Sequence, residues 1–285
     1  NADISMDVVD LFHEMVDAED ASPEDLVVIV EVLLELDAPA VLMQHMSRLS
    51  DASEEEAACI HATLSIFESL LEAQPECSTN LAQRDGVMAW LLNRIKVRGF
   101  HANKLYAAEL LSMLLCNNPS NQSKLGQLEG ILSLLTSASQ YKRRDPSDLE
   151  EAELIENTFS CLRLTLSLPE NQLRFLKAEG IELMILTLKE RKYASLCALS
   201  VLDASLRNNG ANCERFVDIR GFKTIFPLIG SSPPPLPAFS KGKKEREAAQ
   251  LSFDEYVASL LTTLFQLLSD DRRMRLLGKL AEDEM

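Results

Sequence analysis

Apolar residues recur every three or four positions in several long segments of the chain, a spacing that places them on one face of an α-helix. Leu110, Met113 and Leu114 show this spacing within one segment. Pro or Gly follows most of these segments and would end a helix there. The pattern predicts five long helices, over 54–74, 103–117, 150–168, 193–209 and 252–269.

A shorter motif occurs three times between these segments. In each copy an Asn precedes a Gly by nine positions, and a basic residue followed by an apolar one comes three positions after the Asn. We expect a short helix after the Asn, a sharp turn at the Gly, which has no Cβ to obstruct it, and a second helix after the turn. The pairs are Asn121 with Gly130, Asn171 with Gly180 and Asn212 with Gly221, and a looser copy runs from Asn80 to Gly86.

The spacing of the four glycines predicts the architecture. Glycines 86, 130, 180 and 221 are separated by 44, 50 and 41 residues, and the long middle interval contains a polar insertion, YKRRDPSDLEEAE, at 141–153. Armadillo and HEAT repeats have periods of about 40–47 residues. The sequence therefore predicts an all-α, right-handed solenoid of the armadillo or HEAT type with about five to six helical repeats.

The predicted solenoid divides into a cap and an array. We expect residues 1–50 to form an acidic N-terminal helical cap with a degenerate first repeat, and residues 51–285 to form the armadillo repeats. A Pro- and Lys-rich insertion at 230–250 interrupts the array, and its PPPLP could dock as polyproline II or be a loop of variable length. Asp271 takes the Asn position in a last copy of the motif, and we expect the chain to be part of a longer protein. The repeats are predicted near 54–100, 103–144, 150–192, 193–230 and 251–285.

The charge is concentrated at one end of the chain. The 285 residues carry a formal net charge of −16, and residues 1–80 hold 19 acidic side chains and one basic side chain, Arg48, a net charge of −18. Such a segment repels nucleic acid and attracts a basic partner. It also fits a solvated surface that keeps the protein soluble.

No constellation of residues in the sequence indicates catalysis. The six cysteines form no C-x-x-C pair and most lie in apolar helical segments, which suggests buried free thiols and a reducing compartment. The four histidines share no metal-ligand spacing, and no nucleophile elbow, Walker loop or dinucleotide fingerprint occurs. We therefore predict no catalytic, metal or cofactor-binding residues, no cofactor and no enzymatic activity. Basic residues occur in small groups without interleaved aromatics, which does not favour direct nucleic-acid readout.

A protein-binding surface remains, and in armadillo proteins the third helices of the repeats line it. Import receptors of the importin α type read basic peptides there with Trp and Asn four residues apart. The only Trp, Trp90, lies on a predicted second helix. A generic import receptor is therefore disfavoured, because the stacking positions for Lys stems are missing. The matching positions here are Ser65 and Ser69, Glu109 and Met113, Phe159 and Arg163, and Ser200 and Ala204.

Five landmark segments are spread over the whole chain. They are MDVVDLFHEMVD from Met6, HANKLYAAELLSMLL from His101, FLKAEGIELM from Phe175, NCERFVDIRGFKTIFPL from Asn212 and RMRLLGKLAEDE from Arg273. The segment from Asn212 is too long a match for generic armadillo similarity. Together the landmarks resemble one armadillo family, the nuclear β-catenin-like proteins associated with the spliceosome.

The resemblance implies a nuclear, non-enzymatic scaffold or adaptor in pre-mRNA splicing. Its implied partners are proteins of the nineteen complex of the spliceosome and basic, localisation-signal-like segments of splicing factors. The alternatives are a nuclear-import cargo adaptor and a purely architectural spliceosome subunit with no peptide groove in use. Self-association through the N-terminal cap also stays open. We predict that the partner-binding residues include Ser65, Glu68, Ser69, Glu72, Glu109 and Met113.

Overall fold

The computed structural model describes residues 2–17, 23–84, 86–234 and 242–282, and these ranges contain helices and no β-strand. The predicted all-α class is confirmed. Contacts divide the chain into two compact units, unit 1 (Asn1–Leu128) and unit 2 (Glu129–Met285). This boundary falls inside the predicted repeat at 103–144, so the division of the array into sequence repeats stays a prediction.

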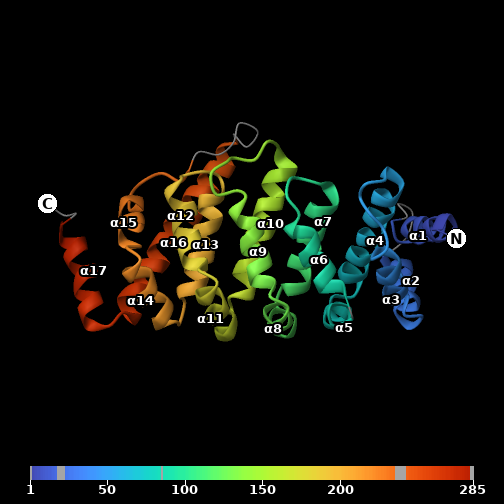
Figure 1. The fold of residues 1–285 in the computed structure, drawn as a ribbon, viewed down its shortest axis with the longest axis horizontal. Helices are drawn as coiled ribbons and strands as arrows, with labels where there is room; N and C mark the ends of the chain where they lie inside the picture. The colour runs from blue at the N-terminus through green and yellow to red at the C-terminus, as the bar shows by residue number, and fades with distance from the viewer. Residues whose placement is uncertain (1, 18–22, 85, 235–241, 283–285) are drawn as a thin grey trace. The chain divides into compact units, whose positions relative to one another are not determined.

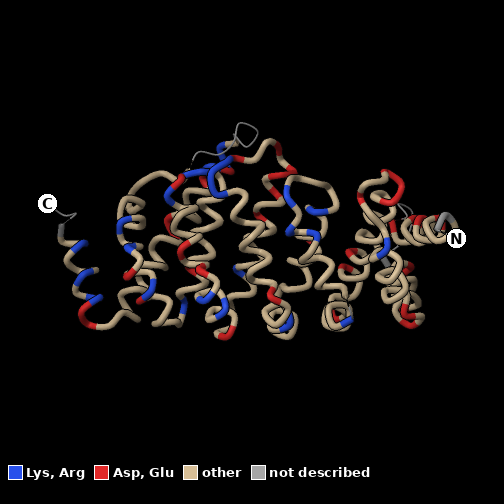
Figure 2. Tube along the Cα trace, in the orientation of Figure 1, with Lys and Arg blue, Asp and Glu red and all other residues tan. Residues whose placement is uncertain are grey.

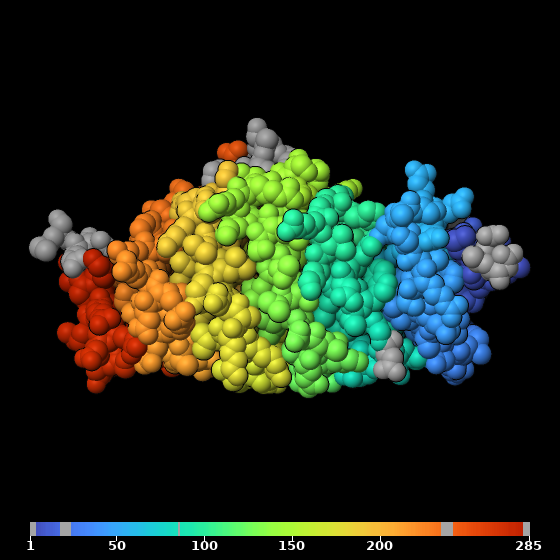
Figure 3. All heavy atoms as spheres, in the orientation of Figure 1, coloured from blue at the N-terminus to red at the C-terminus, as the bar shows by residue number. Residues whose placement is uncertain are grey.

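Three long helices form the main layer of each unit (Figure 1). In unit 1, α1 packs against α4 and α4 packs against α7, while in unit 2 α10 packs against α13 and α13 against α16. Successive segments of unit 2 form successive bands of atoms in Figure 3, as expected where each repeat contacts its neighbours. These helices are α1 (Ala2–Val16), α4 (Glu54–Ala73), α7 (Ala102–Leu115), α10 (Leu149–Thr165), α13 (Ala194–Leu206) and α16 (Lys243–Leu267).

Short helices alternate with the long ones, as the motif predicts. Proline begins α8 and α11, where its missing N–H has no helical partner to lose. Asn118 and Asn209 cap α8 and α14, and their side chains accept hydrogen bonds from the backbone N–H three residues later. The first helices of the motif are α5 (Ser78–Gln83), α8 (Pro119–Gln127), α11 (Pro169–Lys177), α14 (Gly210–Asp218) and α17 (Asp270–Glu282). The second helices are α6 (Val87–Lys96), α9 (Gly130–Ser139), α12 (Gly180–Lys189) and α15 (Phe222–Ile225), which continues as the 3₁₀ turn Phe226–Leu228.

Two further helices complete the N-terminal part of unit 1. Helix α2 (Pro23–Glu35) and α3 (Ala38–Met46) both pack against α4, as α1 does. Their buried residues include Val30, Leu33 and Leu42, which are 5% exposed or less. The predicted cap helices therefore form, and they share their core with the first long repeat helix.

The motif asparagines are fully buried anchors. Asn121, Asn171 and Asn212 have no exposed surface, and each Nδ2 donates to a carbonyl oxygen at the end of the preceding long helix. These carbonyls have no partner within their own helix, so the asparagine satisfies them. The acceptors are Leu114 (2.7 Å), Thr165 (3.1 Å) and Ser205 (2.7 Å).

Two predicted members of this motif do not act as anchors. Asn80, in the looser copy, is exposed, and so is Asp271, at the start of α17. Helix α17 is held differently, because Arg272 pairs with Asp218 on α14 at 3.0 Å. Position in the motif alone therefore did not identify which polar residues are buried.

At two of the motif glycines a Cβ would be obstructed, as expected, and the obstruction comes from a phenylalanine ring. At Gly180 and Gly221 the left-handed backbone belongs to the residue before, Glu179 (φ 57°) and Arg220 (φ 66°). A Cβ at either glycine would lie 2.5 Å from the ring of the phenylalanine five residues earlier. These positions require glycine for close packing of the two short helices, whereas Gly86 has the expected positive φ of 90°.

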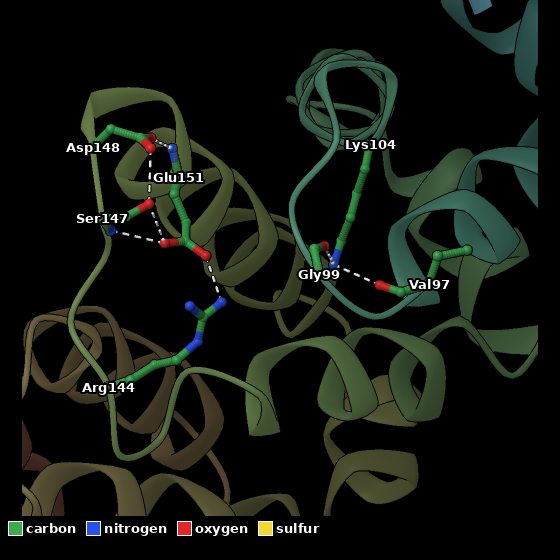
Figure 4. A network of polar contacts seen from close by, with 7 residues as sticks. All are labelled: Val97, Gly99, Lys104, Arg144, Ser147, Asp148 and Glu151. Carbon is green, nitrogen blue, oxygen red and sulfur yellow. Dashed lines mark hydrogen bonds and ion pairs between the residues drawn. The ribbon is translucent and has the colours of Figure 1, made fainter. Parts of the chain in front are cut away.

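Residues 141–148 of the predicted polar insertion form a fixed strap in unit 2, and residues 149–153 are the first turns of α10. Tyr141 is buried, and the guanidinium of Arg144 lies 4.8 Å from the centre of its ring. Glu151 is 2% exposed and accepts hydrogen bonds from the Ser147 backbone N–H (2.8 Å), the Ser147 hydroxyl (3.0 Å) and the Arg144 guanidinium (Figure 4). Asp145 accepts from Lys192 Nζ and from the Tyr193 backbone N–H, both at 2.9 Å. The strap is therefore held by Glu151 at the start of α10 and by the turn just before α13.

A buried lysine closes a loop in unit 1. Lys104, in the first turn of α7, is 1% exposed. Its Nζ donates to the carbonyl oxygens of Val97 (2.7 Å) and Gly99 (3.1 Å), just after α6 ends (Figure 4). A cation at this place also complements the negative end of the α6 dipole.

The insertion predicted at 230–250 is shorter than its sequence suggests. Helix α16 begins at Lys243, so residues 243–250 belong to a 25-residue helix, and the predicted start near 252 was wrong. Lys, Glu, Ala and Gln are good helix formers, and they extend the apolar pattern of the helix backwards. Most of the PPPLP segment falls outside the described residues.

Candidate protein-binding surface

Helices α4 and α7 pack side by side in unit 1 and bring the predicted binding residues onto one pair of helices. Spacings of three and four residues align side chains along one helix face. Of the six predicted binding residues, Glu72 is exposed and the other five are half-buried, so none of them belongs to the buried core. Helix α4 contributes Ser65, Glu68, Ser69 and Glu72, and α7 contributes Glu109 and Met113.

A tyrosine that the sequence interpretation missed lies between these helices. Tyr106, on α7, donates its hydroxyl hydrogen to Glu68 Oε2 on α4. Burial raises the pKa of the Tyr106 hydroxyl, and the hydrogen bond to Glu68 raises it further. The tyrosine therefore stays protonated at neutral pH and holds the Glu68 carboxylate in place on the surface.

A second polar cluster supports the same pair of helices. The ring of His61, on α4, lies 4.9 Å from the ring of Tyr106, and its Nδ1 lies 3.3 Å from Asn103 Oδ1. Asn103 donates from Nδ2 to Asp51 Oδ1 (2.8 Å) and to the Ala57 carbonyl oxygen (2.9 Å). These bonds fix the start of α7 against α4 and so keep the two helix faces in register.

Unit 2 repeats the tyrosine–glutamate arrangement. Tyr193, just before α13, donates to Glu156 on α10, as Tyr106 donates to Glu68. The Tyr and the Glu of each pair are 37 and 38 positions apart in the sequence, respectively, which is close to the length of one repeat. A search for Glu and Tyr at this separation could have found both pairs in the sequence.

The matching positions in unit 2 are not all on the surface. Phe159 is 1% exposed, so its predicted place in a surface ladder was wrong, because the apolar stripe of α10 turns this residue inward. Arg163, four residues later, is exposed. Ser200 is half-buried and donates to the Cys197 carbonyl oxygen at 2.7 Å, and Ala204 is also half-buried.

Trp90 lies on α6, outside the layer of long helices. The guanidinium of Arg94 lies 5.9 Å from the centre of its ring, and Arg94 also pairs with Asp51. The tryptophan therefore already has a cation on its face, supplied by its own chain.

The cysteines lack the features of nucleophiles. Burial raises the pKa of Cys59 to about 11 and of Cys213 to about 12, so both thiols stay protonated at neutral pH. Cys116 is exposed, contrary to the expectation of burial in apolar helical segments. Among the described residues, no group of three or more His, Cys, Asp and Glu side chains could hold a metal ion. The helices of the same residues include none long and apolar enough to cross a membrane.

The whole sequence matches one protein family. The family model described as "Catenin-beta-like, Arm-motif containing nuclear" covers residues 1–285. The chain belongs to this family. The resemblance seen in the sequence landmarks is thereby confirmed, and with it the armadillo class of the fold and the nuclear character of the family.

Named relatives occur in mammals and in fission yeast. Beta-catenin-like protein 1 of Homo sapiens and of Rattus norvegicus are each 42% identical to the chain over 289 aligned positions, which cover 100% of the chain and 50% of the relative. The homologue from Schizosaccharomyces pombe is 31% identical over 290 positions, 48% of its length. The chain thus spans about half the length of the curated relatives that it matches.

A solved structure from work on a phosphorylation switch between cadherin and beta-catenin is also similar. It matches 91% of the chain and 60% of the solved chain, with a TM-score of 0.44 and 14% sequence identity. Similarity at this level does not bear on partners or on function.

Proposed function

We propose that the protein is a non-enzymatic nuclear scaffold in pre-mRNA splicing, associated with the nineteen complex of the spliceosome. In this role, the α4–α7 surface binds a Lys- and Arg-rich, localisation-signal-like segment of a splicing factor. Membership of the nuclear β-catenin-like armadillo family supports the cellular setting. The binding mode rests on the chemistry of unit 1.

The observation that carries the proposal is the acidity of the unit that bears the surface. Residues 1–128 hold 21 acidic and 7 basic residues, a net charge of −14, whereas residues 129–285 hold 23 and 21, a net charge of −2. Red segments of the trace, which mark Asp and Glu, recur along α1 to α4 in Figure 2. Glu68, Glu72 and Glu109 add carboxylates on two neighbouring helices, and a basic segment would approach this unit under a favourable field.

Charge reversal tests the proposal. The variant E68K/E72K/E109K should bind a Lys- and Arg-rich splicing-factor peptide at least about tenfold more weakly than the native protein, because attraction becomes repulsion. The matched control E153K/E170K/E255K changes the charge equally at exposed positions of unit 2 and should keep its affinity. The neutral variant E68Q/E72Q/E109Q should lie between the native protein and the reversal. Equal loss in the control and the reversal would show that only the total charge matters.

The two alternative functions, an import adaptor and a purely architectural subunit, can be distinguished by the partners that the protein binds. An import adaptor would bind a carrier of the importin β type, and a pull-down from nuclear extract that contains such a carrier would favour that function. A purely architectural subunit would keep its spliceosomal partners in the E68K/E72K/E109K variant. The peptide-binding scaffold should lose them.

A further inference from the structure

An apolar groove lies between α1, α2 and α3 at the N-terminal end of unit 1. Its volume is about 810 Å³, and its lining is apolar except for Ser5 and His45, whose Oγ and Nε2 lie 2.8 Å apart. Large apolar side chains line it while remaining open to solvent, with exposed fractions of 59% for Val28, 47% for Val32 and 73% for Leu36. Soluble proteins rarely leave such a contiguous apolar patch without a partner.

This groove is distinct from the core of the unit. Helices α1 and α2 already bury one face, which includes Val16 (6% exposed) and Val30 (fully buried), in the part of unit 1 where both pack against α4. Ile4 and Val8 on α1 belong to a second apolar face, since they are 62% and 42% exposed. Helices with more apolar surface than their core requires are typical of binding grooves.

The groove has an acidic rim, on which Arg84 already pairs with Asp37, between the lining residues Leu36 and Ala38. Glu31 and Glu35 directly precede Val32 and Leu36 on α2, and all four side chains are exposed. On α1, Asp7 and Glu14 likewise precede Val8 and Met15. Residues 1–47 contain no Lys and no Arg. Glu31, Glu35, Asp7 and Glu14 therefore favour an occupant that combines apolar side chains with positive charge.

We propose that the α1–α3 groove is a docking site for an amphipathic helix of a partner protein, with apolar side chains in the groove and Lys or Arg side chains against the acidic rim. Helices bind such grooves through residues at positions i, i+3, i+4 and i+7. A second copy of this chain is a poor occupant, because the same face would bring acidic residues against acidic residues. A small ligand is also disfavoured, because Ser5 and His45, the two polar residues of the lining, already bond to each other.

The test uses the full-length protein and designed helical peptides of about 18 residues, five helical turns. One peptide has Leu at helical spacing and Lys flanks, a second has the same composition with the Leu positions scrambled, and a third has Glu flanks. Fluorescence anisotropy should show binding of the first peptide alone. The variants V32D/L36D and V32S/L36S should weaken it at least about tenfold, and E31K/E35K should remove the preference for Lys over Glu flanks.

Matched controls separate binding from folding and from the other surface. L132D/L186D places the same charges at exposed leucines of unit 2 and should leave peptide binding unchanged. E68K/E72K/E109K should also leave peptide binding unchanged. The proposed binding at the groove and the proposed binding at the α4–α7 surface can therefore be disproved independently of each other. Thermal unfolding of V32D/L36D and V32S/L36S should follow the native curve, because Val32 and Leu36 are 47% and 73% exposed.

Three results would overturn the inference. Equal binding of the scrambled peptide would show non-specific adsorption to apolar surface. A dimer in sedimentation that V32D/L36D dissociates would assign the groove to a second copy. The third result comes from maleimide labelling of full-length protein that carries Cys116→Ser. Val28→Cys tests the groove in this background, and Leu186→Cys is the control. A Val28→Cys variant that is protected from maleimide, while the Leu186→Cys variant reacts, would show that the protein's own chain fills the groove.

Discussion

Phe175 and Phe216 each lie against a glycine five residues later, and this contact explains the most regular feature of the motif. The sequence predicted a turn at Gly180 and Gly221 that a Cβ would obstruct, but it did not predict that Glu179 and Arg220 carry the positive φ or that the phenylalanine rings occupy the space of the Cβ. The physical reason lies in a contact between two helices, which no local backbone preference encodes. The phenylalanine and the glycine five residues after it therefore pack against each other as a pair.

Substitution of Gly180 tests this contact. Gly180→Ala should lower the free energy of unfolding by about 1–3 kcal/mol, because its Cβ would lie 2.5 Å from the Phe175 ring in a packed site. Gly278→Ala is the control, since no atom lies within 4 Å of its Cβ and it sits within α17. That variant should be neutral or slightly stabilised. Urea unfolding measures both, and an unchanged midpoint for Gly180→Ala would contradict the packing account.

The buried asparagines allow a second test at this scale. Asn212→Ala leaves the Ser205 carbonyl oxygen without its 2.7 Å partner and should cost about 1–3 kcal/mol of stability. Asn93→Ala, at an exposed position of α6, is the control and should change stability by less than about 0.5 kcal/mol. Similar values from chemical denaturation of both variants would remove the anchor role from Asn212.

At the scale of elements, helical periodicity predicted the long helices well because their apolar stripes are local signals. It missed the start of α16 at Lys243, where charged helix formers were interpreted as a loop. It also missed the fixed strap at 141–148, since its partners Lys192 and Tyr193 lie far along the sequence. Contacts between distant polar residues do not follow helical periodicity, so this pattern did not predict the Tyr106–Glu68 pair; only its separation of 38 residues, close to that of Tyr193–Glu156, could have indicated it.

The strap predicts a pH dependence. Burial raises the pKa of Asp145, but the hydrogen bonds from Lys192 and from the Tyr193 backbone N–H outweigh it, so the net pKa lies below the usual 3.8. A group whose pKa is lower in the folded state stabilises the protein above its unfolded pKa and loses this effect as pH falls through the folded pKa. Native protein should therefore be more stable than Asp145→Asn at pH 7, and the difference should shrink as the pH falls below about 4.

Thermal unfolding of both proteins between neutral pH and about pH 3 measures this difference. Asp254→Asn, at an exposed position of α16, serves as the control and should show no such convergence. A difference between native protein and Asp145→Asn that stays constant across this range would show that the carboxylate charge plays no part in holding the strap.

At the scale of the whole molecule, the charge asymmetry between the two units could be predicted from the sequence, whereas the α1–α3 groove could not. The counts of acidic and basic residues give the charges directly. The groove depends on how three amphipathic helices share one core, and their sequences also fit an ordinary solenoid cap. For the same reason the sequence located Glu68, Glu72 and Glu109 on repeat helices but not their neighbours in space.

The asymmetry predicts a salt dependence for the complex with a basic splicing-factor peptide. Exposed charges are screened over about 8 Å at physiological ionic strength and over about 3 Å at 1 M. Affinity should therefore fall several-fold as salt rises from about 0.1 M to about 0.5 M, and titration calorimetry measures it. An affinity that survives this change would remove the electrostatic basis of the proposed binding.

Site-specific crosslinking in nuclear extract tests the central claim most directly. A photoreactive residue at Met113, on the α4–α7 surface, should crosslink to Lys- and Arg-rich segments of splicing factors, identified by mass spectrometry. The same residue at Leu186, exposed on α12 of unit 2, should not. Enrichment of basic splicing-factor peptides at Met113 alone is the result that the account predicts. Crosslinks at Met113 to proteins outside the splicing machinery, or the same products at both positions, would contradict it.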